Sequence, residues 1–128
     1  MGYESKIYFV RKYGVTNRGC EVIATLDMCN MGHYPAIDNF KKLFNKPIDF
    51  SIFIPKSDTD YEKCFKTTDE YGDQLKSGDI YELYHQIDNI IYAAENQDSE
   101  TYWRYYLLRD MLFSFRAFKD IYVVHYGY

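Results

Sequence analysis

Two long helical patterns lie close together between residues 79 and 119, and they limit the folds open to this chain more than any other feature. In the first pattern, apolar residues recur at offsets that place them on one face of a helix: Ile80, Leu83, Ile87, Ile90, Ile91 and Ala94. Asp79, with Glu82 three residues later, has the spacing of a capping box. We therefore expect a long helix that begins near Asp79.

The second pattern runs from Glu100 to about Lys119 and is also typical of a helix. Its inward residues are expected to be Tyr105, Leu108, Leu112, Phe115 and Phe118. Only the short stretch from Asn96 to Ser99 separates the two patterns. A connection this short makes the chain reverse direction between two neighbouring helices. We therefore expect an antiparallel pair.

Strand-forming residues stand near both ends of the chain. Lys6–Arg11 and Cys20–Met28 flank a turn-forming stretch at residues 14–19, which predicts a hairpin. Residues of Cys20–Met28 alternate between two faces, as a half-buried strand requires. A third strand is expected at Asp49–Ile54. A last strand is expected at Ile121–Tyr126. Because it lies close to the C-terminus, we expect it to be paired inside the sheet.

Together these patterns predict an α+β fold. A short helix is expected after Pro35, with one apolar face formed by Ile37, Phe40, Leu43 and Phe44. The expected architecture is a mainly antiparallel sheet of about four strands, with two long antiparallel helices and one short helix. The chain has 128 residues and no repeat or linker, which indicates a single domain spanning residues 1–128.

The strongest chemical motif follows the second expected strand, where a carboxylate, a thiol and an imidazole fall within seven residues. A soft thiolate combined with an imidazole suits zinc. The fourth ligand is expected from the last strand, because C-terminal strands often pair centrally. The sequence therefore predicts a structural zinc held by Asp27, Cys29, His33 and His125.

The fourth ligand stays open, with Cys64 and then Cys20 as alternatives to the histidines. The three cysteines are an odd number without a readable signal peptide, so they are expected to be reduced thiols. A catalytic pair of Cys29 and a histidine is conceivable, but no sequence signature supports it. The sequence also has no phosphate-binding loop and no nucleophile elbow. We expect no enzymatic activity. A zinc hydrolase would need an open coordination position.

Acidic residues dominate the stretch from Asp79 to Glu100, which contains no Lys or Arg. Tyrosines are interleaved with them, and aromatics make up 20% of the chain, a composition that suits protein recognition. The expected partner-binding residues are Asp79, Glu82, Asp88 and Glu95. A net charge of −4 argues against direct binding of nucleic acid.

No apolar run reaches the ~18 residues that a spanning helix needs. The opening residues Met1–Ser5 have neither a basic nor an apolar signal-peptide region, so we expect no secretion signal. These patterns predict a protein that makes no contact with a membrane. We expect it to be a monomer.

Several segments resemble small phage and prophage proteins of Gram-positive bacteria. They are Met1–Tyr8, Glu21–Ala24, Asp27–Cys29, Tyr71–Asp73 and Val123–Tyr128. Some streptococcal phage proteins of this kind are type II anti-CRISPR proteins, which inhibit Cas9. Asp27, Cys29 and His125 fall within the matching segments, whereas His33 does not clearly match.

The resemblance implies a phage counter-defence protein that acts in the cytoplasm of an infected bacterium. Its partner would be Cas9 or another host defence protein, bound stoichiometrically so that target DNA is not engaged. An acidic surface with tyrosines suits competition for the positively charged channel in which Cas9 holds nucleic acid. The alternative is a host-takeover or regulatory binding protein. A small zinc hydrolase is the third possibility.

Overall fold

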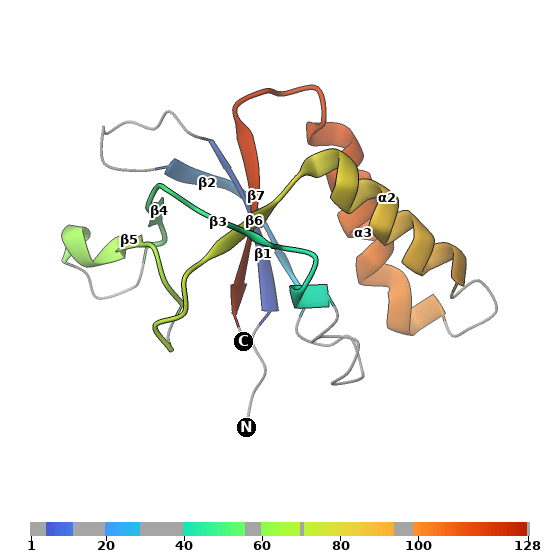
Figure 1. The fold of residues 1–128 in the computed structure, drawn as a ribbon, viewed down its shortest axis with the longest axis horizontal. Coiled ribbons are helices and arrows are strands. Elements are labelled where there is room, and N and C mark those ends of the chain that lie inside the picture. Colours follow the sequence, from blue (N-terminus) through green and yellow to red (C-terminus); the bar gives the residue numbers. More distant parts are fainter. Residues whose placement is uncertain are drawn as a thin grey trace.

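The structure is a computed structural model, and it describes residues 5–11, 20–28, 40–55, 60–69, 71–93 and 99–127. A curled sheet occupies one part of the molecule, and a pair of helices packs beside it (Figure 1). Three long strands form the centre of the sheet: β1 (Ser5–Arg11), β2 (Cys20–Asp27) and β7 (Ile121–Gly127). The hairpin and the central position of the C-terminal strand are as the sequence predicts.

Short strands extend this centre on both sides. They are β3 (Lys46–Pro47), β4 (Ile52–Phe53), β5 (Phe65–Lys66) and β6 (Lys76–Gly78). The strand order is β3-β6-β7-β1-β2-β4-β5. The sheet is mixed, because β2 pairs with β4 in parallel while the other pairs are antiparallel.

The predicted sheet of about four strands is therefore wrong, although the α+β class holds. Seven strands are described, and four of them are only two or three residues long. A pattern of alternation needs more residues than that to show in a sequence. The predicted strand Asp49–Ile54 shrinks to Ile52–Phe53.

Two α-helices lie in the described residues: α2 (Ile80–Ala93) and α3 (Ser99–Phe115). A single 3-10 turn, η1 (Tyr61–Cys64), precedes β5. The expected short third helix starts outside the described residues, and only Phe40 and Lys41 of its C-terminal part are helical here. Neither α2 nor α3 combines the length and the apolar character that crossing a bilayer requires.

Helix α3 ends earlier than the sequence predicts. The amide of Phe118 donates to the carbonyl of Phe115 at 3.1 Å, which closes a turn in place of further helix. Phe118 is consequently 53% exposed, so its predicted inward position is wrong. The other inward positions hold, because Tyr105, Leu108 and Leu112 are buried.

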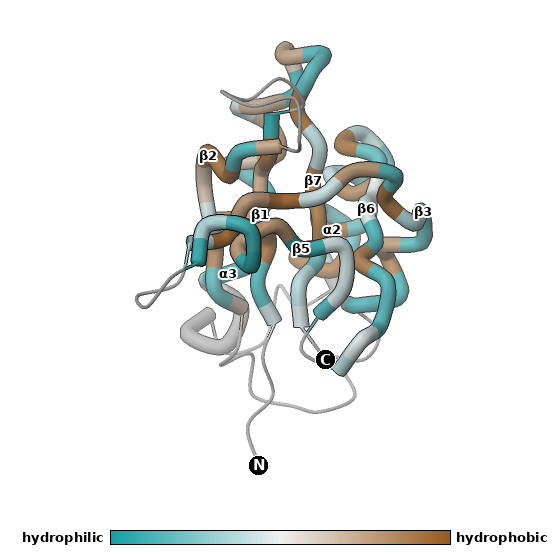
Figure 2. Tube along the Cα trace, turned by 90° about the vertical axis from the view of Figure 1, so that its left-hand side faces the viewer, coloured by the Kyte–Doolittle hydropathy of each residue, from teal (hydrophilic) through white to brown (hydrophobic). Residues whose placement is uncertain are grey.

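The sheet has an apolar core on each face. On the face covered by the helices, residues such as Ile7 and Phe9 of β1 pack with Leu83 and Leu112. On the opposite face, Tyr8 and Val10 of the same strand pack with residues that include Ile52. Figure 2 shows the apolar stretches of β1 and β7 running through the middle of the molecule.

Candidate functional site

His125 lies in β7 opposite Ile7 of β1, and its side chain is 5% exposed. Its Nε2 atom forms a hydrogen bond of 2.8 Å with Oγ of Ser5. The rings of Phe40 and Phe44 lie 5.9 Å and 5.4 Å from the imidazole, centre to centre. Burial removes the imidazole from water, and this lowers its pKa to about 4. His125 is therefore uncharged at neutral pH.

A hollow of about 330 Å³ opens beside His125. It is lined by side chains of both charges and by apolar groups: Lys41, Phe44, Asp69, Asp73, Gln74, Leu75, Lys76, His125 and Gly127. Asp69 is 8% exposed, and its Oδ1 atom accepts hydrogen bonds from the amides of Tyr71 at 2.8 Å and Asp73 at 3.0 Å. These bonds fix the carboxylate at the wall of the hollow.

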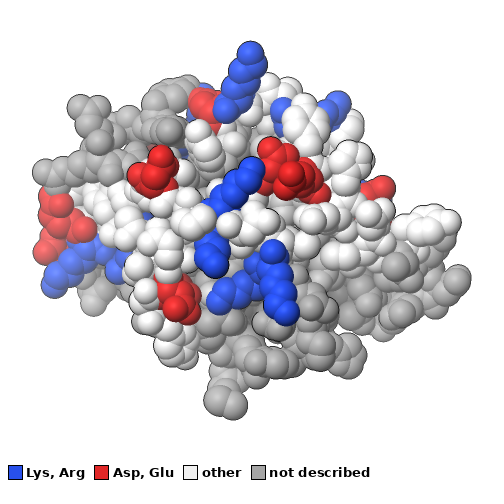
Figure 3. Space-filling model, in the orientation of Figure 1, with Lys and Arg blue, Asp and Glu red and all other residues white. Residues whose placement is uncertain are grey.

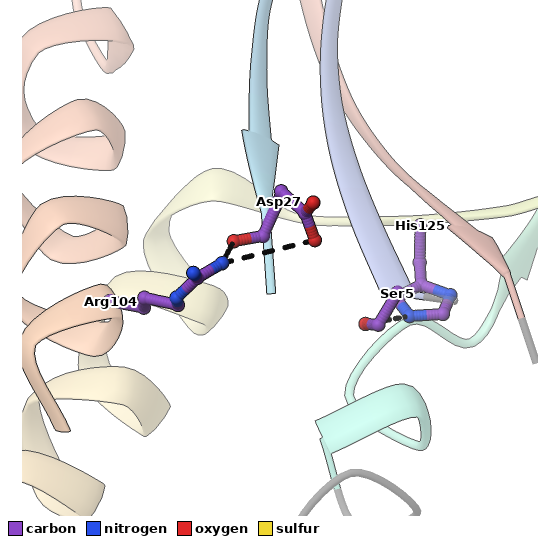
Figure 4. Close-up of polar contacts among 4 residues, drawn as sticks. All are labelled: Ser5, Asp27, Arg104 and His125. Carbon is purple, nitrogen blue, oxygen red and sulfur yellow. Dashed lines mark hydrogen bonds and ion pairs between the residues drawn. The ribbon is translucent and has the colours of Figure 1, made fainter. Parts of the chain in front are cut away.

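The residues predicted to hold zinc are only partly described. Cys29 and His33 lie outside the described residues. Asp27 faces Lys6 in the sheet whereas His125 faces Ile7, so strand alternation puts the two side chains on opposite faces. Figure 4 shows Asp27 next to Arg104 of α3, and His125 next to Ser5.

Within the described parts of the chain, no group of three or more metal-ligating side chains comes together. The two alternative ligands are buried in separate places: Cys20 packs in the core opposite the helices, and the Sγ atom of Cys64 lies 3.7 Å from the carbonyl of Asp60. Zinc binding through Cys29 and His33 stays a prediction.

A hydroxyl next to an imidazole also raises the question of nucleophilic chemistry. Ser5 is fully buried, with 0% exposure, and its Oγ atom points at the ring of His125 within the sheet. A nucleophile needs to reach its substrate. The Ser5–His125 pair therefore acts as an internal polar contact in the described structure.

The predicted acidic surface divides into residues with different local roles. Asp79 caps α2, because its Oδ1 atom accepts from the amides of Tyr81 at 3.0 Å and Glu82 at 3.1 Å. Asp88 pairs with Arg109 of α3 at 3.0 Å. Glu82 is exposed in the first turn, and Glu95 lies outside the described residues. The stretch from Asp79 to Glu100 has no Lys or Arg, but Arg109 of α3 supplies a positive charge next to Asp88.

A second surface of interest, which the sequence analysis missed, lies on the side of α3 away from the sheet. Its large side chains are between 38% and 51% exposed: Trp103, Tyr106, Leu107 and Phe113. We call these four residues the outer face of α3. Their spacing of three, four and ten residues from Trp103 was the available signal, since it places them on one side of a helix.

Arginines of α3 lie over the aromatic rings of this outer face. The guanidinium of Arg104 is 4.7 Å from the ring centre of Trp103. That of Arg109 is 5.4 Å from Tyr106, and that of Arg116 is 3.5 Å from Phe113. Such cation–π contacts hold the rings and the guanidinium groups in one layer.

Comparison with known proteins gives no relative for this chain: no family model, no curated protein and no solved structure matches it. Two surfaces stand out in the described residues, namely the hollow beside His125 and the outer face of α3. The first combines charged groups with a cavity, and the second combines exposed rings with arginines. They suit different kinds of ligand.

Proposed function

We propose that this chain is a binding protein without enzymatic activity, which docks on a protein partner through the outer face of α3. The resemblance to phage proteins makes Cas9 the partner, bound stoichiometrically so that it does not engage target DNA. The observation that carries the proposal is that α3 has two opposed apolar faces. Tyr105, Leu108 and Leu112 face the sheet, and the outer face points away from it.

A helix that is apolar on two sides normally has both sides covered. Among the described residues, α2 and the sheet cover the inner side, and α2 also reaches the edge of the outer face, where the rings of Tyr84 and Phe113 lie 6.0 Å apart, centre to centre. Large apolar side chains gathered on one exposed surface mark interaction sites in proteins. A protein partner that covers Trp103 and Phe113 would remove them from water.

The composition of the outer face favours a protein over a small ligand. Tryptophan, tyrosine and arginine are the residue types that contribute most to binding at protein interfaces. Arg104 and Arg109 are held by Asp27 and Asp88, so their guanidinium groups are already positioned next to the rings. Pre-positioned side chains lose less conformational entropy on binding.

The start of α2 carries exposed residues of its own. Glu82 is exposed in the first turn of the helix, next to Tyr81, which is 60% exposed. Exposed charges at the rim of an interface mainly set the association rate and its salt dependence. A basic region of Cas9 would therefore be approached faster than a neutral surface.

The decisive experiment co-purifies this protein with Cas9, with and without guide RNA, and measures DNA cleavage. Phe113→Lys introduces a charge into the outer face, so we expect it to abolish co-purification and to restore cleavage. Tyr71→Lys is the matched control: Tyr71 is 68% exposed in a turn preceding β6, and its replacement should leave inhibition unchanged.

Three results would contradict the proposal. Equal inhibition by Phe113→Lys and wild type, with both variants folded, would move the contact away from α3. No binding to Cas9, with or without guide RNA, would exclude the anti-CRISPR function and leave the regulatory binding protein as the alternative. If size-exclusion chromatography showed a dimer that Phe113→Lys dissociates, the outer face would be covered by a second copy.

A further inference from the structure

We propose that the hollow beside His125 binds a small phosphate monoester that carries hydroxyl groups. This site is distinct from the outer face of α3 and does not depend on the function proposed for that face. The hollow is lined by charges of both signs, the lysines Lys41 and Lys76 and the carboxylates of Asp69 and Asp73. Lys76 lies directly opposite His125 in the pairing of β6 with β7.

The two lysines of the lining, Lys41 and Lys76, fit a dianion. Lys41 and Lys76 line the hollow, and together with Lys42 they also line an adjoining hollow that shares Phe44. Within the described structure, Lys41 and Lys76 form no ion pair with an acidic side chain. Figure 3 shows Lys and Arg side chains near the centre of the face that it displays, with Asp and Glu side chains around them, on a protein whose net charge is −4.

Phosphate matches this cluster better than a carboxylate does. A phosphate monoester has a second pKa of ~6 and so carries nearly two negative charges at pH 7. It also offers several strong acceptor oxygens to ammonium donors. A carboxylate offers one charge to at least two ammonium groups.

Asp69 supplies an acceptor for hydroxyl groups. The two amide bonds to Asp69 go to its Oδ1 atom, and its Oδ2 atom accepts none from the described residues. His125 also lines the hollow, with its Nε2 atom bonded to Ser5. A carboxylate oxygen serves as an acceptor for ligand hydroxyls.

Size and charge together narrow the ligand. A volume of about 330 Å³ lies at the small end of the range for ligand pockets and holds a phosphorylated monosaccharide. Asp69 and Asp73 would repel the next phosphate of a nucleic acid strand. Phe44, which is buried, supplies the apolar wall.

The experiment uses ribose 5-phosphate as the probe, with ribose and inorganic phosphate as separate arms. Binding to the full-length protein is followed by NMR, through the ring resonances of His125 and the amide of Gly127. We expect ribose 5-phosphate to shift both signals, inorganic phosphate to bind more weakly, and ribose to give no shift up to ~10 mM.

Variants test which residues hold the phosphate. Lys41→Gln should weaken binding of ribose 5-phosphate about tenfold, because a charge-assisted hydrogen bond is lost. Lys41→Arg should retain most of the affinity. Lys119→Gln is the matched control, since Lys119 is exposed in the turn between α3 and β7 and lines a different groove.

The proposal is overturned by either of two results. If ribose 5-phosphate shifts neither signal, the hollow does not bind this class of ligand. If Lys41→Gln and Lys119→Gln weaken binding equally, the phosphate is attracted by the general charge of the protein and not by this site.

Discussion

At the scale of single residues, burial decides the chemistry of His125. The sequence presented it as a metal ligand on a C-terminal strand. In the folded chain its Nε2 atom is taken by Ser5, and two phenylalanine rings flank it. None of these partners is near it in the sequence, so their effect on the imidazole becomes visible only after folding.

The lowered pKa of His125 predicts a specific loss of stability in acid. Its folded pKa of about 4 lies below the ordinary value of 6.5. Between these values the unfolded chain takes up a proton that the folded chain does not, so the free energy of unfolding falls as the pH is lowered. The loss is roughly 3 kcal/mol between pH 6.5 and pH 4, and it is absent above that window.

Chemical denaturation at pH 7, 5.5 and 4.5 measures this loss. In His125→Gln the difference between pH 7 and 4.5 should be smaller by that amount, because the titrating group is gone. An NMR titration of the wild-type imidazole provides an independent check. A ring that titrates near pH 6.5 in the folded protein would contradict the burial argument.

Zinc is tested at the same scale. We expect protein purified without added metal to contain one zinc per chain, and Cys29→Ser to lose it, because a thiolate is the preferred soft ligand of the motif. Asp27→Asn should retain the zinc, since the carboxylate of Asp27 already pairs with Arg104 at 3.8 Å. Elemental analysis of the three proteins decides the matter, and a metal-free wild type would refute the motif.

At the scale of elements, both long helices were predictable from the sequence. Which faces of the helices are buried and which are exposed was only partly predictable. The stripe of α2 and its cap are local features, and the structure has both. The inward stripe predicted for α3 does not include the outer face, although the spacing of those four residues places them on one side of a helix. That this side is exposed depends on the position of the sheet, which the sequence does not show.

The cap of α2 gives a prediction that separates stability from partner binding. Asp79→Ala should lower the free energy of unfolding by about 1 kcal/mol, because two amides of the first turn lose their acceptor. Asp79→Asn keeps an acceptor, so its stability should stay close to that of wild type. Thermal melts compare the three proteins.

Inhibition of Cas9 by Asp79→Asn then reports on the charge alone. If the acidic start of α2 contacts a basic region of the partner, this variant inhibits more weakly at low salt while its melting temperature is unchanged. Unchanged inhibition would limit Asp79 to its capping role.

At the scale of the whole molecule, β1 joins the two cores. Ile7 and Phe9 belong to the core under the helices, whereas Tyr8 and Val10 belong to the core on the other face. β1 also pairs with both β2 and β7 along its length. Loss of either core therefore removes support from the same central strand.

This arrangement predicts that the two cores unfold together. Phe9→Leu and Val10→Ala, one in each core, should each cost roughly 1–3 kcal/mol. Each should shift the helical circular-dichroism transition and the aromatic fluorescence transition by the same amount, as a two-state protein requires. A Val10→Ala variant that shifts only one of the two transitions would show that the cores unfold separately.

The sequence by itself determined the hairpin of β1 and β2, the strand character of β7, and the extent of α2, because each leaves a periodic pattern over seven or more residues. Tertiary structure alone decided the short edge strands, the parallel pairing of β2 with β4, the Asp88–Arg109 pair and the hollow beside His125. Those features join residues that are far apart in the chain, and their energies depend on burial and proximity, which no local pattern records.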